Sequence, residues 1–367
     1  MEDKKIRYVF SIGREEKLGN NNYAKEFFYG YNFFKSRFSN VGFIEYRENK
    51  NFYWNIFDKV LRRLTNLPFY FEIAHNKWNR DELKYSDFIV FTNERLALSS
   101  FFILRKIKKI YDTKSIMISM GLFAKKSDTL FSNSLQNYFI KKLLKEINFV
   151  VFLSSAEKER ASINFPEFKD KYVFIPFSID STFWMRDDSE NKEKKNILFI
   201  GNDGRRDYKK ILKIANELKE YEFTLITSQI SEDEILSNNV NLVKGHWNLS
   251  ELTDVEIKKY YESAQITLIP LVESFQPSGQ SVALQSMAMK VPVLITKTKG
   301  FWDYENFENN KHLVFIENES LEVWVKEIKL ILDDEERLNN IKNNSRDLIE
   351  EKFNLTTFNE NLIKLIY

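Results

Sequence analysis

Residues 273–296 read Glu273-Ser-Phe-Gln-Pro-Ser-Gly-Gln-Ser-Val-Ala-Leu-Gln-Ser-Met-Ala-Met-Lys-Val-Pro-Val-Leu-Ile-Thr296, a loop of small residues followed closely by a helix and a buried strand. The apolar run Ile266–Leu271 before this stretch predicts a strand of a parallel sheet. The turn Pro277–Ser281 opens a helix near Ser278, whose first N–H groups lack partners and lie at the positive end of the helix dipole. The sequence therefore predicts an α/β fold with an anion site at this helix N-terminus.

The same stretch resembles the donor-binding segment of retaining glycosyltransferases of the GT-B type, family 4 in particular. Leu284-Gln-Ser-Met-Ala-Met-Lys-Val-Pro-Val-Leu294 is similar to that family's Leu-Glu-Ala-Met-Ala-x-Gly-x-Pro-Val-Val signature. Ile175-Pro-Phe-Ser-Ile-Asp-Ser-Thr-Phe183 resembles the interdomain motif Pro-x-Gly-Val-Asp-x-x-x-Phe, and Asn196-Ile-Leu-Phe-Ile-Gly201 resembles the strand that opens the second domain.

Short apolar runs alternate with longer amphipathic segments, which is the pattern of parallel sheets covered by helices. We expect six strands in each half: residues 6–12, 41–46, 87–93, 115–120, 149–154 and 172–177, then 196–201, 223–227, 241–244, 266–271, 292–296 and 312–316. The resemblance implies two Rossmann-like domains facing each other across a cleft: 1–178 for the acceptor and 195–350 for the donor, with 351–367 as a helix returning to the first domain. A polar linker is expected between 178 and 195.

Composition limits the classes of protein and of site. Without cysteine there is neither a disulfide framework nor a thiolate metal site, and His75, His246 and His312 are too far apart in sequence for a recognisable metal motif. No apolar run approaches the roughly 18 residues of a membrane span, so we expect a cytoplasmic protein. Residues 1–180 hold 31 Lys and Arg against 21 Asp and Glu, and the remainder hold 24 against 32. This basic first half indicates either an anionic partner or ordinary solvated surfaces.

A nucleotide-sugar donor needs cations and N–H groups for its diphosphate. Gly201 begins a glycine-containing turn after the first strand of the second half, where the family places an Arg or Lys on the donor phosphates. The resemblance makes Arg205, Arg206 and Lys209 candidates, with Arg206 favoured. The alternative is a chain reversal with solvated cations.

Gln285 occupies the position at which the family has a glutamate that accepts hydrogen bonds from the ribose hydroxyls. An amide offers only one acceptor oxygen, so Gln285 is either a weaker ribose ligand or a polar residue on the helix edge. Glu273 lies four residues too early for the family's other glutamate. Either Glu273 contacts the donor sugar as a catalytic residue, or the turn Ser278-Gly279-Gln280-Ser281 does so, with Gln280 a catalytic candidate; Glu273 is otherwise a solvated loop carboxylate.

Three further candidates follow expected strands, at the end where open α/β sheets bind ligands. His246 and Trp247 come after one strand of the second half, and Trp247 either stacks on the base or covers the sheet edge. Gly13 begins a polar loop after the first strand, which either approaches a substrate or only connects elements.

We expect neither a metal nor another cofactor. The sequence has no Asp-x-Asp, so arginine, lysine and the helix N-terminus must neutralise the leaving diphosphate. The acidic run Asp333–Glu336 is interpreted as a helix start, where carboxylates interact favourably with the dipole.

The segment Phe52–Leu64 places Trp54, Phe57, Leu61 and Leu64 along one helical stripe beside Lys59, Arg62 and Arg63. Such a helix either packs on the core or lies on an anionic bilayer. Phe101–Lys109 allows the same two interpretations.

Together these features predict a glycosyltransferase of the hexosyltransferase kind. It would move a sugar from a nucleoside diphosphate, with retention, to a glycan or lipid-linked acceptor in polysaccharide or glycolipid assembly. The expected partners are the donor, the acceptor and an anionic membrane surface, and not nucleic acid. The alternatives are a sugar-nucleotide epimerase and a non-catalytic nucleotide-binding or partner-binding protein of similar fold.

Overall fold

The computed structural model describes residues 4–46, 52–124, 129–186, 196–245, 252–317 and 320–366. The chain forms two compact units. The first comprises Met1–Asn20, Phe27–Pro176 and Asn359–Tyr367, and the second comprises Asn21–Glu26 and Phe177–Phe358. The second unit thus contains a short segment from near the N-terminus, which the sequence did not indicate. Of residues 351–367, those from Asn359 onward belong to the first unit.

The first unit is built on a parallel sheet with the strand order β2-β1-β3-β4-β5-β6. Its strands are short and mostly buried, because helices cover both faces of a parallel sheet and each strand must be apolar on both. Phe88–Phe91, for example, is buried at every position. The strands are β1 (Ile6–Phe10), β2 (Val41–Glu45), β3 (Phe88–Phe91), β4 (Lys114–Ser119), β5 (Phe149–Phe152) and β6 (Tyr172–Phe174).

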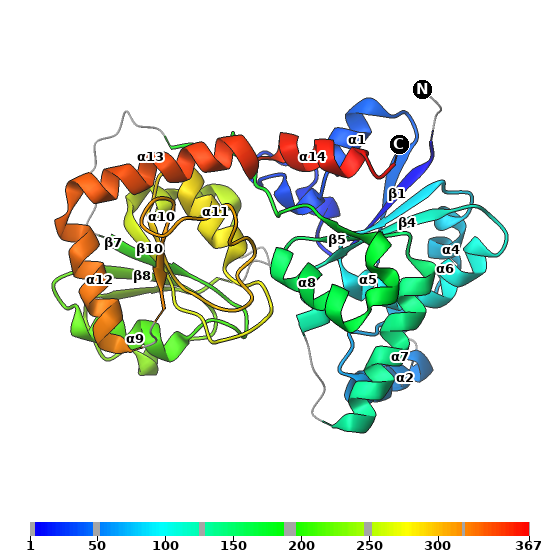
Figure 1. Cartoon of the computed structure of the whole chain (residues 1–367), viewed down its shortest axis with the longest axis horizontal. Coiled ribbons are helices and arrows are strands. Elements are labelled where there is room, and N and C mark those ends of the chain that lie inside the picture. Colours follow the sequence, from blue (N-terminus) through cyan, green and yellow to red (C-terminus); the bar gives the residue numbers. More distant parts are fainter. Residues whose placement is uncertain are drawn as a thin grey trace. The chain divides into compact units, whose positions relative to one another are not determined.

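Helices lie on both sides of this sheet (Figure 1). They are α1 (Tyr31–Arg37), α2 (Phe52–Thr65), α3 (Phe71–Ala74), α4 (Lys77–Leu83), α5 (Glu94–Ser99), α6 (Phe101–Lys108), α7 (Leu130–Glu146) and α8 (Ser155–Asn164). Helices α2 to α8 share one hydrophobic core with strand residues such as Ile89 and Val150. None of the described helices has the length and apolar character of a membrane span.

The second unit has a parallel sheet with the order β12-β11-β10-β7-β8-β9. Its first strand, β7, therefore lies in the middle, and the chain moves outward first on one side and then on the other. The neighbours β7 and β10 form the point at which the order reverses, and doubly wound sheets bind ligands outside the carboxyl ends of such strands. The strands are β7 (Asn196–Ile200), β8 (Glu222–Ile226), β9 (Val240–Val243), β10 (Ala264–Ile269), β11 (Val293–Thr296) and β12 (Val314–Ile316).

Six helices complete the described part of the chain: α9 (Tyr208–Glu217), α10 (Asp254–Ser263), α11 (Gln280–Ala288), α12 (Leu321–Asp333), α13 (Glu335–Lys352) and α14 (Leu355–Ile363). The long helix α13 packs along α11 (Figure 1). The buried Arg346 of α13 donates to the carbonyl oxygens of Ala288, Trp184 and Ser181, at 2.8, 2.8 and 3.1 Å. Arg346 thereby fixes the C-terminal end of α11, whose N-terminus faces the strand-order reversal.

The structure confirms the predicted fold class, and all twelve expected strands form, with their ends shifted by up to three residues. Two helices begin where the sequence places a hydroxyl three residues before a glutamate, a spacing that predicts a helix start. Ser154 accepts the N–H of Glu157 at the start of α8, and Thr253 with Glu256 forms a capping box at α10. Local side-chain chemistry sets these boundaries, which explains why the sequence reveals them.

Candidate donor site at the strand-order reversal

Two loops meet at the carboxyl ends of β7 and β10. The Asp207 N–H donates to the Pro270 carbonyl at 2.9 Å, and the Val272 N–H donates to the Arg205 carbonyl at 2.9 Å. Arg206 and Leu271 form an isolated antiparallel bridge between the same loops. The chain after β7 is therefore fixed against the chain after β10, at the edge where the fold favours a ligand.

Arg206 is buried in this loop pair, with 5% of its surface exposed. Its Nε donates to the Ile200 carbonyl at 3.3 Å, and its Nη1 lies 2.9 Å from Asp203 Oδ2. Gly201 leaves the room that the side chain needs, because a Cβ at Gly201 would lie 2.6 Å from Arg206 Cγ and Nε. The guanidinium is thus held rigidly, and its Asp203 partner is itself half exposed.

The N-terminus of α11 lies beside this guanidinium. Its N-cap, Gly279, has a φ of +77°, which favours glycine. A Cβ at Gly279 would lie 2.7 Å from Ile269 Cγ2 and 3.6 Å from Arg206 Nη1, so a larger residue would intrude at this point. Because the N-cap is a glycine, the N-cap residue has no side chain with which to cap the helix. A buried cation and an uncapped helix N-terminus therefore adjoin at the reversal, which is an arrangement for binding an anion.

The other predicted residues of this region lie in several places. Ser278 precedes the N-cap and is half-buried, while Gln280 and Ser281 are the first two residues of α11. Arg205 is half-buried in the loop after β7, and Lys209 is exposed on α9. Outside this region, Gly13 lies in the first unit after β1, with a φ of +88°. His246 and Trp247 lie outside the described residues.

Glu273 has a partner that the sequence did not indicate. Its carboxylate accepts the N–H of Lys299 at 3.0 Å, which ties the loop before α11 to the loop after β11. The two loops touch at Gly300, where a Cβ would lie 2.5 Å from the carbonyl carbon of Phe275. In this structure Glu273 connects the loop before α11 to the loop after β11, and its contact with the donor sugar stays a prediction.

Gln285 is fully buried, contrary to the expectation of a ribose ligand or of a polar residue on the helix edge. Its Nε2 donates to Glu26 Oε1 at 3.0 Å, and its Oε1 accepts the hydroxyl of Tyr261 at 3.4 Å. Both ends of the amide are therefore occupied within the protein. The departure from the family's glutamate has a physical reason, because a glutamate at position 285 would place a second carboxylate against Glu26.

Glu26 belongs to the segment Asn21–Glu26, and sequence reasoning missed it. Besides Gln285, its carboxylate accepts Trp184 Nε1 at 2.8 Å and the Asp180 N–H at 3.3 Å. The segment is also held through Asp254, which accepts the N–H of Ala24 at 2.9 Å. Burial and the nearby Asp254 raise the pKa of Glu26 to about 7. A glutamate in a polar N-terminal stretch carries no signal for such long-range partners.

A second buried glutamate that the sequence did not reveal lies in the first unit. The carboxylate of Glu157 accepts Ser119 Oγ at 2.7 Å and the N–H groups of Gly121 and Phe123 at 3.0 and 3.2 Å. Burial, with a contribution from Glu94, raises the pKa of Glu157 to about 7. The loop after β4, at the carboxyl edge of the first sheet, is thus held by a carboxylate. In the part of the chain that the structure describes, no three His, Asp or Glu side chains form a group that could hold a metal ion.

Residues 180–348 match the family model of the glycosyl transferases group 1. Solved structures similar to the chain include a glycosyltransferase from Rickettsia africae ESF-5, with 15% identity, a TM-score of 0.68 and coverage of 100% of this chain and 98% of that chain. Sucrose-phosphate synthase from Thermosynechococcus elongatus has 12% identity, a TM-score of 0.70 and coverage of 99% and 98%. HepE from Anabaena, solved with UDP and glucose, has 12% identity, a TM-score of 0.66 and coverage of 99% of each chain. No curated protein is significantly similar to the chain.

The structural similarity establishes the GT-B fold, and the family match covers most of the second unit, including the site around Arg206 and α11. The second unit carries a domain that matches the group 1 glycosyl transferases. Glycosyl transfer is therefore favoured over the epimerase and the non-catalytic binding protein.

Proposed function

We propose that the second unit binds a nucleoside diphosphate sugar and that Arg206 and the N-terminus of α11 hold its diphosphate. The observation that carries the proposal is the buried guanidinium beside an uncapped helix N-terminus at the strand-order reversal. The structures of HepE with UDP and with UDP-glucose support a donor of this class, because HepE shares the fold. The acceptor in this proposal is a glycan or a lipid-linked glycan of cell-surface polysaccharide or glycolipid assembly.

The chemistry follows from where charge develops. The bond between the sugar's anomeric carbon and the diphosphate oxygen breaks, and a bond from that carbon to the acceptor oxygen forms. The leaving diphosphate gains negative charge, which a fixed cation and helix N–H groups stabilise without reorganising. We assign the acceptor's proton to the departing phosphate oxygen on the same face of the sugar, so that the anomeric configuration is retained. The anomeric signal in the product's proton NMR spectrum tests retention; an inverted product would exclude it.

A thermal-shift panel of nucleosides, nucleoside monophosphates and nucleoside diphosphates tests the donor site. A ligand at 100 times its Kd stabilises the folded state by about 2.7 kcal/mol, so binding raises Tm. The proposal expects a clear increase with at least one nucleoside diphosphate, a smaller one without the second phosphate, and little increase in Arg206→Gln. An equal increase in Arg206→Gln would remove this residue from the site.

We also propose that transfer needs no metal ion, since Arg206 and the helix N-terminus supply the positive charge that the diphosphate requires. Activity should survive excess EDTA within the error of the assay. Activity that disappears with EDTA and returns only with Mg²⁺ or Mn²⁺ would contradict this part of the proposal.

The first unit carries a surface that supports the proposed bilayer contact. The predicted stripe on α2 is divided: Trp54 and Leu61 pack on the core, whereas Phe57 and Leu64 are exposed at 43% and 41%. The exposed face of α2 carries six large apolar or aromatic side chains, from Phe52, Tyr53, Ile56, Phe57, Val60 and Leu64. Soluble surfaces rarely gather so many apolar groups without a partner.

The exposed charges on helix α2 itself have one sign. The exposed charged residues of α2 are Lys59 and Arg63, and its one acidic residue, Asp58, is buried. The adjacent helix α7 (Figure 1) exposes Leu130 and Phe131 near its start. Apolar side chains edged by cations favour the interface of an anionic bilayer.

Vesicle co-sedimentation tests the contact. Arg62 donates to the Phe69 carbonyl at 2.7 Å, so the charge-reversal variant should leave it intact and change Lys59→Glu with Arg63→Glu. We expect wild type to bind anionic vesicles at low salt, to detach as salt rises, and to bind less in this variant. Lys213→Glu with Lys326→Glu, an equal charge change on exposed residues of the second unit, is the matched control. Equal binding to neutral and anionic vesicles, or none to either, would contradict the contact.

A further inference from the structure

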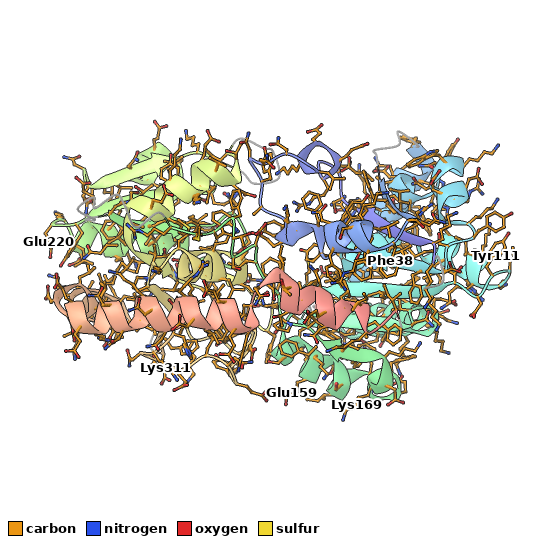
Figure 2. All side chains as sticks on the ribbon, turned by 90° about the horizontal axis from the view of Figure 1, so that it is seen from above. Phe38, Tyr111, Glu159, Lys169, Glu220 and Lys311 are labelled. Atoms are coloured by element: carbon orange, nitrogen blue, oxygen red, sulfur yellow. The ribbon has the colours of Figure 1, made fainter. Side chains whose placement is uncertain are left out.

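A hollow of about 320 Å³ lies between α4 and α6 in the first unit. Its floor is apolar: Ile103 and Ile107 are buried core residues, while Ile110, beyond the end of α6, is 71% exposed. Tyr111 completes the floor and lies at the surface of the first unit (Figure 2). We call this hollow the α4/α6 groove. Its exposed apolar floor gives a hydrocarbon chain a place to bind.

The rim of the groove is basic. Lys77, Arg80 and Lys106 line it, and among the described residues none of the three has a carboxylate within ion-pair distance. The rim's one acidic residue, Asp81, lies 3.1 Å from Lys84 and is therefore already paired. The positive field reaches the neighbouring His75, whose pKa falls to about 4 because of burial and the charges of Arg80 and Lys106. Three unneutralised cations around a small hollow favour a phosphate group.

We propose that the α4/α6 groove binds one anionic phospholipid, with the phosphate on Lys77, Arg80 and Lys106 and part of an acyl chain on the isoleucine floor. This inference rests on the bilayer contact proposed for the first unit. His75 lies between the groove and helix α2: its ring is 4.8 Å from the Trp54 ring of α2, and the rim charges of Arg80 and Lys106 act on it. A lipid in the groove would add a specific headgroup contact to the nonspecific insertion of α2.

The location separates this site from the reaction. Helices α4 and α6 run back from the carboxyl edge of the sheet toward the amino edge, where Tyr111 precedes β4. Within the first unit, the loops at Gly13 and at Ser119–Phe123 lie at the carboxyl edge instead. A lipid in the groove therefore leaves the carboxyl edge free for an acceptor, and the groove anchors the enzyme without taking part in transfer.

Calorimetry with a short-chain lipid tests the groove without a bilayer. Dihexanoyl phosphatidylglycerol, kept monomeric below its critical micelle concentration, is titrated into the full chain, with dihexanoyl phosphatidylcholine and inorganic phosphate as comparisons. We expect the phosphatidylglycerol to bind at least about tenfold more tightly than either comparison, because only it combines a net negative charge with a chain. Arg80→Gln with Lys106→Gln should weaken its binding by about tenfold or more.

Lys59→Gln with Arg63→Gln is the matched control, since it removes two cations from α2 and leaves the groove intact. This control should bind the monomeric lipid like wild type while binding anionic vesicles less. Unchanged lipid binding in the folded groove variant would overturn the proposal, as would equal affinity for phosphatidylcholine or for inorganic phosphate. Lipid binding to the groove combined with unchanged vesicle binding by the α2 variant would instead contradict the α2 contact.

Discussion

Two parts of helix α11 were predicted to contact the donor: its N-terminus at Gly279, which we call the mouth, and its middle at Gln285. In the structure these two parts have different surroundings. At the mouth, the N-cap Gly279 lies beside the Arg206 guanidinium and has no side chain with which to cap the helix. In the middle, five residues further along α11 than Gln280, the fully buried Gln285 is bonded to Glu26 and Tyr261. Positions in one sequence motif can thus have opposite roles, because each turn of a helix presents different faces to solvent and to core.

The surroundings of Gln285 also show how a residue distant in sequence can compensate for a substitution in a family motif. The segment Asn21–Glu26 supplies the carboxylate, and Gln285 supplies the amide that can donate to it. A glutamine at position 285 therefore matches Glu26, and it does not indicate loss of activity.

The largest effect should come from Gln285→Glu. The new carboxylate would lie about 3 Å from Glu26, in a site that already contains Asp254, so burying it should destabilise the fold by about 3–5 kcal/mol near pH 7.5. Chemical denaturation measures the loss. Stability should recover in part near pH 5, where one carboxyl is protonated.

The exchanged variant, Glu26→Gln with Gln285→Glu, is the control for that prediction. It restores one amide and one carboxylate to the pair, so it should regain most of the lost free energy of unfolding. If the double variant is less stable than Gln285→Glu alone, the Glu26–Gln285 contact does not explain residue 285.

The pH dependence of stability is the next largest effect. The pKa of Glu26 is raised to about 7 in the folded state, so the folded protein keeps a proton that the unfolded chain releases at lower pH. The associated stability is complete below about pH 4.5 and is lost as pH rises through 7, a change on the order of 3 kcal/mol. Glu157, with the same direction of pKa change, adds a similar loss. Glu26→Gln should therefore flatten the wild-type decline in part, and Glu26→Gln with Glu157→Gln should flatten it further. An unchanged decline in both variants would show that these glutamates are not the cause.

Gly279→Ala tests whether the backbone conformation at the N-terminus of α11 is needed for diphosphate binding. The positive φ and the 2.7 Å approach to Ile269 should cost about 1–2 kcal/mol of stability and displace the start of α11, which weakens nucleoside diphosphate binding. Gly204→Ala is the control, because a Cβ there meets nothing within 4 Å. Equal behaviour of the two variants in denaturation and in calorimetry would show that Gly279 is not needed at the mouth.

The smallest effects should come from the cations beside Arg206. Arg205 is half-buried and Lys209 is exposed, so solvent screens their charges. Arg205→Gln and Lys209→Gln should each weaken diphosphate binding by less than about threefold, or about 0.7 kcal/mol. Calorimetry measures the affinity. A larger loss of affinity in either variant would show that the diphosphate binds closer to that residue than to Arg206.

Much of this fold was predictable because its signals are local. Continuous apolar runs marked the strands, and hydroxyl and carboxylate pairs marked the starts of α8 and α10. The position of Arg206 was also predictable, because it follows the first strand of a Rossmann-like unit; its contact with the diphosphate stays a prediction. The partners of Gln285 and Glu273 were not predictable, because the bonds to Glu26 and Lys299 join residues distant in sequence.

The most direct test of the account compares Arg206→Gln with the exchanged variant of Glu26 and Gln285. Calorimetry measures the Kd of a nucleoside diphosphate for each variant and for wild type, after denaturation has shown that all three are folded. A lost charge-assisted contact costs about 1.5–3 kcal/mol, so Arg206→Gln should bind about 10-fold to 100-fold more weakly, while the exchanged variant binds within about threefold of wild type. Wild-type affinity in Arg206→Gln, or a comparable loss of affinity in the exchanged variant, would contradict the division of α11 into a binding mouth and a structural middle.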